Sequence, residues 1–87
     1  MPKIAHIDDP ISHGGRVIAA SDDVFADGRA VARVGDIALC RKHGRVRILT
    51  GSSTVFVNGR AAAVDGSKCS CGASVLVPNG SVFADEN

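Results

Sequence analysis

The residues best suited to chemistry are Cys40 and His43, which lie three positions apart in the segment CRKHG (40–44). A thiol and an imidazole at this spacing can bind one metal ion from a single turn of the chain. The glycine that follows allows the backbone to turn sharply. A lone C-x-x-H pair often arises by chance, so its meaning depends on what surrounds it.

An internal repeat supplies those surroundings. The segment VFADGRAVA (24–32) aligns with VFVNGRAAA (55–63) at an offset of 31, and a shortened third copy, VFAD, follows at 82–85. The three phenylalanines of the chain, Phe25, Phe56 and Phe83, all occupy the same position in the repeat. Self-similarity of this kind indicates a structure built from three similar units.

A residue able to bind metal precedes each copy of the repeat. His13, His43 and Cys71 lie eleven or twelve residues before the valine that begins the corresponding copy, and a glycine follows each of them. An apolar segment comes next in all three cases. Each unit is therefore predicted to consist of a ligand, a glycine, a strand, a turn and a second strand.

These positions predict a metal site with four ligands: His13, Cys40, His43 and Cys71. Thiolate and imidazole ligands favour zinc over magnesium or calcium, which prefer oxygen, and closed structural zinc sites are tetrahedral. Structural zinc supplies about 10–16 kcal/mol of apparent binding free energy, against a typical total stability of about 5–15 kcal/mol. We therefore expect one structural zinc ion per chain, with His43 as the repeat-equivalent ligand and Cys40 as the extra one.

Two further residues are weaker candidates for the same site. Cys69 could replace Cys71, although its side chain should point the opposite way if the segment is extended. His6 is a second substitute, but a surface histidine is the expected reading. Taken singly, each cysteine could equally be a small buried residue and each histidine a surface residue.

A catalytic zinc site would keep one coordination position open and have a carboxylate nearby. Four ligands close the site, and Asp36 and Asp65 lie next to glycines, where capping of a turn is their expected role. We therefore expect no enzymatic activity, and a small zinc hydrolase is the minor alternative. The pair Cys69 and Cys71 is weak support for redox chemistry.

Composition predicts a single all-β domain spanning residues 1–87, with no extension domain. Strands are expected at 15–19, 45–49 and 73–77, and a second set at 23–27, 54–57 and 81–84, with hairpin turns at Asp27-Gly28 and Asn58-Gly59. The net charge of +1 argues against a nucleic-acid partner, and the basic run from Arg41 to Arg47 is expected to be a solvated face. The N-terminus lacks the apolar stretch of a signal peptide, so a cytoplasmic protein is expected.

Several segments in order resemble the PAAR-repeat proteins. They are DPISHGG (9–15), VFADGRAVARVGD (24–36), CRKHG (40–44), GSSTVFVNGRAAA (51–63) and SCGA (70–73). The Pro-Ala-Ala-Arg signature survives only loosely, as AVAR (30–33) and AAAV (61–64). The family's Gly-Asp pair is present as Gly35-Asp36, reads in reverse as Asp65-Gly66, and is represented by Asp8-Asp9 at its first place.

This resemblance implies a small cone of short β-hairpins with pseudo-threefold symmetry and a zinc ion near its vertex. It implies a tip that caps the trimeric VgrG spike of a type VI secretion system, aiding membrane puncture and effector delivery. The protein would be a monomer when free, would contact the target membrane transiently, and would leave the cell on the spike without a signal peptide. An adaptor that loads a separate toxin effector, or the tip of a contractile phage tail, is the alternative role.

Overall fold

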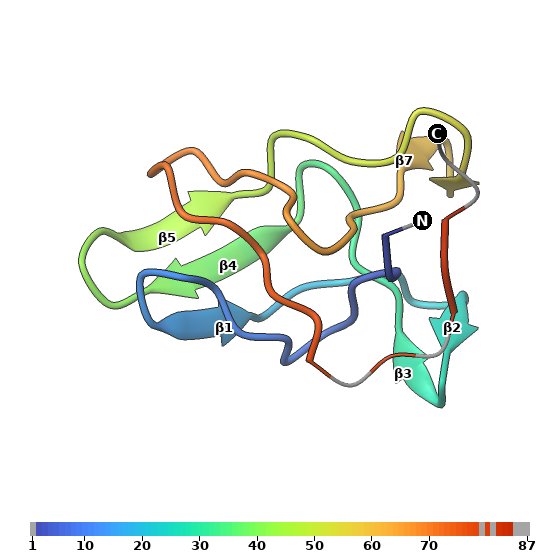
Figure 1. Ribbon diagram of the computed structural model, residues 1–87, viewed down its shortest axis with the longest axis horizontal. Coiled ribbons are helices and arrows are strands. Elements are labelled where there is room, and N and C mark those ends of the chain that lie inside the picture. The colour runs from blue at the N-terminus through green and yellow to red at the C-terminus, as the bar shows by residue number, and fades with distance from the viewer. Residues whose placement is uncertain (1, 79, 81, 85–87) are drawn as a thin grey trace.

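A computed structural model describes residues 2–78, 80 and 82–84, and this part of the chain contains strands and turns but no helix. The strands are β1 (Gly15–Val17), β2 (Phe25–Ala26), β3 (Arg29–Ala30), β4 (Ile37–Cys40), β5 (Gly44–Arg47), β6 (Phe56–Val57) and β7 (Arg60–Ala61). They fold into a body of 31 × 27 × 24 Å (Figure 1). The all-β prediction is confirmed, and none of the described segments is a helix able to cross a membrane.

The largest sheet has the order β1-β4-β5, with both pairs antiparallel. Strand β4 was not predicted from the sequence, although it alternates between buried and exposed residues: Ala38 and Cys40 are buried, and Leu39 is exposed. Cys40 pairs with Gly44, so the segment 41–43 is the loop of a β4–β5 hairpin.

The other predicted strands are shorter than expected. Segment 73–77 forms single bridges in place of a regular strand, with Val75 opposite Ile11 and Ser74 opposite Lys68. The predicted strand at 81–84 is partly outside the described residues, but Phe83 forms a bridge with Lys3. Each strand has only two to four residues, because the chain turns again soon after each strand begins.

Three buried alanines close a ring of backbone hydrogen bonds at the centre of the molecule. The N–H of Ala5 donates to Ala63 at 2.8 Å, that of Ala63 donates to Ala32 at 2.9 Å, and that of Ala32 donates to Ala5 at 3.0 Å. All three side chains are fully buried. The ring relates the three units by an approximate threefold axis, and alanine is small enough to let the three backbones meet there.

A similar turn follows each alanine of the ring. In each turn the first N–H donates to the side chain of the fourth residue: His6 to Asp9 at 2.7 Å, Arg33 to Asp36 at 2.9 Å, and Val64 to Ser67 at 2.9 Å. The third residue has a positive φ in all three, 71° at Asp8, 93° at Gly35 and 92° at Gly66. Gly66-Ser67 is therefore the counterpart of Gly35-Asp36, and the reading of Asp65-Gly66 as a reversed pair is wrong.

The predicted turn-capping role of Asp36 is confirmed by these hydrogen bonds, but Asp65 behaves differently. Its carboxylate accepts a hydrogen bond from the N–H of Val77 at 3.1 Å and so holds a distant segment. The turn in which Asp65 lies is capped by the Ser67 hydroxyl instead.

Hairpins β2–β3 and β6–β7 lie at the end of the molecule opposite the β4–β5 loop, and we call this end the base (Figure 1). Their turns have positive φ at both central residues, 54° and 76° at Asp27-Gly28 and 54° and 81° at Asn58-Gly59, as predicted. The third counterpart is made by the two chain ends, where the N–H of Ile4 donates to Val82 at 2.8 Å. The N-terminal segment therefore supplies the second strand that the shortened third repeat lacks.

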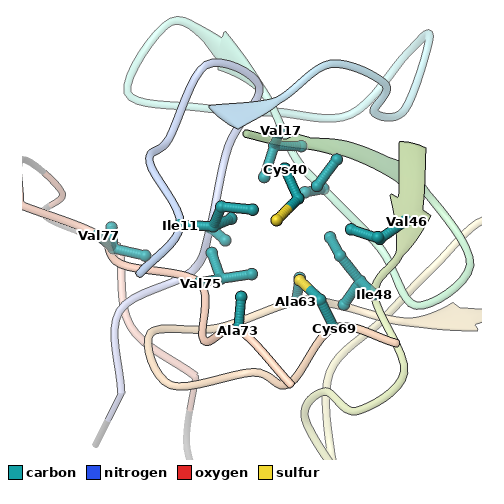
Figure 2. Close-up of a cluster of buried hydrophobic side chains, with 13 residues drawn as sticks. Ile11, Val17, Cys40, Val46, Ile48, Ala63, Cys69, Ala73, Val75 and Val77 are labelled. Atoms are coloured by element: carbon teal, nitrogen blue, oxygen red, sulfur yellow. The ribbon is translucent and has the colours of Figure 1, made fainter. Parts of the chain in front are cut away.

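The core is aliphatic and divides into two clusters. The larger cluster fills the space between the three-stranded sheet and segments 69–77, and Figure 2 shows Val17, Ile48 and Val75 packed around Cys40 and Cys69. The smaller cluster lies under the base and includes Ile4, Val31 and Val57. The larger cluster therefore packs directly beneath the three hairpin tips at 11–15, 40–44 and 69–73.

Candidate metal centre

The structure brings the four predicted ligands together at the end opposite the base. His13 lies in the turn before β1, Cys40 ends β4, His43 lies in the β4–β5 loop, and Cys71 lies in the turn after Cys69. One donor atom from each of the four lies within 4.8 Å of all the others. Among the described residues this is the one group of three or more histidine, cysteine and acidic side chains placed to hold a metal ion.

The spacing of the donor atoms suits a tetrahedral ion. The Sγ atom of Cys40 lies 3.5 Å from Nδ1 of His43 and 3.8 Å from Nδ1 of His13. Zinc–nitrogen and zinc–sulfur bonds of about 2.0–2.3 Å place neighbouring donors of a tetrahedron about 3.3–3.8 Å apart. The two imidazole rings lie 5.6 Å apart and are tilted by 41°, so neither blocks the centre by stacking on the other.

A glycine in the left-handed region follows three of the four donors. Gly14, Gly44 and Gly72 have φ values of 83°, 75° and 90°. The N–H of Gly14 donates to Ile11 at 3.0 Å, and that of Gly72 donates to Cys69 at 2.9 Å. These tight turns end each hairpin immediately beside its donor, so the three tips reach a common centre.

The middle hairpin explains how a threefold repeat yields four donors. Eight residues separate Asp9 from Val17 and Ser67 from Val75, but twelve separate Asp36 from Ile48. Cys40 lies four residues after Asp36, just as His13 follows Asp9 and Cys71 follows Ser67, whereas His43 has no counterpart at either count. Cys40 is therefore the repeat-equivalent donor and His43 the extra one, so the predicted assignment of the two is reversed. The four additional residues of the middle hairpin therefore provide a second donor from one unit.

The electrostatic surroundings favour the thiolate form of Cys40. Burial raises the pKa of this thiol, but hydrogen bonds with the His43 side chain, with the backbone of Lys42 and His43 and with the His13 side chain outweigh it and lower the pKa from 9.0 to about 6. A thiolate is the form that binds metal.

Cys69 is placed differently from the four donors. Its side chain is 2% exposed and belongs to the larger core cluster, where Figure 2 shows it facing Ile48. Burial, together with the nearby Cys71 and Cys40, raises its pKa to about 11. Cys69 bridges Ile48 just as Ile11 bridges Val75, so it occupies a core position of the repeat.

His6 is not the surface histidine that the sequence suggested. Its side chain is completely buried, with Nδ1 2.9 Å from Asp9 and Nε2 3.6 Å from Asp27. The Asp9 carboxylate also accepts a hydrogen bond from Arg29 at 3.2 Å. Asp9, the partner that permits the burial of His6, lies only three residues later in the chain, but no sequence periodicity indicates that the two side chains pair.

The basic run beside His43 is exposed, as predicted for a solvated face: Arg41, Lys42, Arg45 and Arg47. Asp36 is turned away from the donors, because its carboxylate binds Arg33 at 3.0 Å and Arg60 at 3.0 Å. No carboxylate of the described residues joins the four-donor group.

Comparison with protein families identifies the architecture. The model of the PAAR motif matches residues 7–77, which include all four donors and two of the three turns after the alanine ring. The chain belongs to the PAAR-motif family. A comparison with curated proteins gives no match. The PAAR-motif assignment supports a spike-tip type of protein.

Proposed function

We propose that this PAAR protein is a zinc-stabilised, non-enzymatic tip that caps the trimeric VgrG spike of a type VI secretion system. Such a cap would sharpen the spike, aid membrane puncture and support effector delivery. It would be made in the cytoplasm and leave the cell on the spike.

The donor set supports zinc as the bound ion. His13, Cys40, His43 and Cys71 offer two nitrogen and two sulfur donors, a combination that structural zinc sites use. The ion would tie together three hairpin tips, where too little apolar surface remains to hold the chain. Metal analysis of the purified protein should give about one zinc per chain, and a content near zero after purification in zinc-supplemented medium would contradict the proposal.

The observation that carries the docking role is the threefold pattern of the base. Phe25, Phe56 and Phe83 are 61%, 62% and 48% exposed, although they are the only aromatic side chains in the sequence. Their partners in the three pairings are Ala30, Ala61 and Lys3, so they occupy equivalent places. Three equivalent exposed aromatics on a single chain suit a partner with true threefold symmetry, since each can contact one subunit.

Docking can be tested with the purified VgrG trimer. We expect one tip chain per trimer by native mass spectrometry, and we expect Phe56→Ser to weaken binding about tenfold or more, because exposed aromatics dominate such interfaces. Leu39→Ser is the matched control, because Leu39 is also exposed, at 41%, but lies on β4 away from the base. Equal effects of the two variants would refute docking through the base.

A further inference from the structure

One face of the three-stranded sheet carries a concentration of positive charge. Arg16 on β1, Leu39 on β4 and Arg45 on β5 lie directly opposite one another in the register, so their side chains share the outer face. Arg47 lies two residues beyond Arg45 on the same face. Arg41 belongs to the loop that ends the β4–β5 hairpin.

Adding the loop residue Lys42 completes what we call the basic face: Arg16, Arg41, Lys42, Arg45 and Arg47. Within the described part of the chain, only one of these five forms an ion pair, that of Arg16 with Asp8 at 3.3 Å. Both partners are largely exposed, at 59% and 67%, so the pair neutralises little of the charge. Arg47 donates to the carbonyl of Gly35 at 3.0 Å, which orients its guanidinium without neutralising it.

The charge of the molecule is therefore strongly polarised. The basic face holds five of the ten basic residues and, with Asp8, one of the nine acidic residues. It carries a formal charge of +4, whereas the rest of the chain carries −3. The overall value of +1 hides this separation.

We propose that the basic face binds the anionic headgroups of a phospholipid bilayer. Guanidinium groups bind phosphate through paired hydrogen bonds, and four of the five cations are arginines. Leu39 lies exposed between Arg16 and Arg45, which suits the boundary between headgroups and acyl chains. A single-stranded nucleic acid would need aromatic side chains for stacking, but the three phenylalanines belong to the pairings of the base.

This inference deepens the proposed membrane contact by naming its chemistry, but it depends on the sheet surface and not on docking to the spike. Flotation of the purified full chain with vesicles tests it directly. We expect binding to vesicles that contain phosphatidylglycerol, none to phosphatidylcholine alone, and release at high salt.

A matched pair of charge reversals sharpens the test. Arg45→Glu should weaken vesicle binding about 25-fold, or roughly fivefold for each unit of charge. Lys3→Glu changes the net charge equally, but it lies in the strand pairing at the base, and should leave binding within about twofold. Equal losses would show that net charge alone matters and would overturn the proposal, as would binding to duplex DNA tighter than to vesicles. The Arg45→Glu variant should bind the VgrG trimer as tightly as the unchanged protein does. A failure of the lipid-binding proposal can therefore be told apart from a failure of the spike-tip role.

Discussion

Cys40 and Cys69 are equally buried, at 2% exposure each, yet their surroundings give the two thiols opposite chemistry. Both belong to the larger core cluster. Cys40 ends β4 beside two imidazoles, which lower its pKa together with backbone N–H groups, whereas Cys69 meets aliphatic neighbours and its pKa is raised. The difference between the candidate ligand Cys40 and the core residue Cys69 is therefore one of hydrogen-bond partners.

Substituting each of these thiols by alanine separates metal binding from packing. Cys40→Ala should lose bound zinc, and a loss of even ~2 kcal/mol would lower the melting temperature by about 8–16 °C in a domain of this size. Cys69→Ala removes the same atom from an equally buried place, so it should keep one zinc and lose only about 1 kcal/mol. Zinc content by mass spectrometry and calorimetric melting check both, and retention of zinc by Cys40→Ala would contradict the ligand assignment.

The pH dependence of thiol alkylation offers a second test on the metal-free protein. Because the pKa of Cys40 is lowered to about 6, its thiolate persists from neutral pH down to that value, and its alkylation rate should fall only below it. Cys69, with a pKa raised to about 11, should stay unreactive between pH 5 and pH 9 in the folded protein. Iodoacetamide labelling with peptide mass spectrometry follows each site, and a Cys40 rate that rises only near pH 9 would be the contrary result.

The grouping of the four donors could be predicted from the sequence because side-chain type limits the choice and the repeat supplies the positions. The burial of His6 could not, since it depends on Asp9 and on Asp27 from a distant hairpin. In the same way, the exposed state of the three phenylalanines is invisible in composition, which would place them in the core.

At the level of elements, the hairpin turns were predictable and strand β4 was not. Asn-Gly and Asp-Gly require positive φ at both positions, and this local rule predicts the two base hairpins directly. Strand β4 has only four residues, and its partner β1 is more than twenty residues earlier. It also pairs with β5 in a local hairpin, but its four residues, IALC, are all apolar, so no alternation of polar and apolar side chains marks it as a strand in the sequence.

Substitution of Gly15 tests the pairing of β1 with β4. A Cβ atom at this position would lie 1.8 Å from the carbonyl oxygen of Leu39, and its φ of 105° is unfavourable for other residues. Gly15→Ala should therefore separate β1 from β4 and destabilise the protein by more than about 3 kcal/mol. Gly44→Ala, with a φ of 75° and open space around it, should cost only about 1–2 kcal/mol. Denaturant unfolding of both zinc-loaded variants checks this, and equal costs would show that the close approach is unimportant.

For the whole molecule, the repeat predicted three units and the family resemblance implied their pseudo-threefold arrangement, but the alanine ring that joins them could only be seen in three dimensions. The alanine ring links each unit to both others, and the third base pairing joins residues from opposite ends of the chain. Contacts between residues so distant in sequence produce no local periodicity. The three phenylalanines at equivalent repeat positions were among the sequence features that indicated equivalent units.

The same arrangement predicts that the two ends of the molecule depend on zinc to different degrees. The hairpin tips at 11–15, 40–44 and 69–73 meet at the four donors, whereas the hydrogen bonds of Ala5, Ala32 and Ala63 are buried and closed among themselves. Removing zinc with a chelator should therefore speed amide hydrogen exchange at the tips by tenfold or more, while the three alanine amides change little. Hydrogen exchange read by NMR on the zinc-loaded and zinc-free protein resolves both regions. A uniform loss of protection would instead mean that the ring has no stability of its own, and that the ion holds the entire fold.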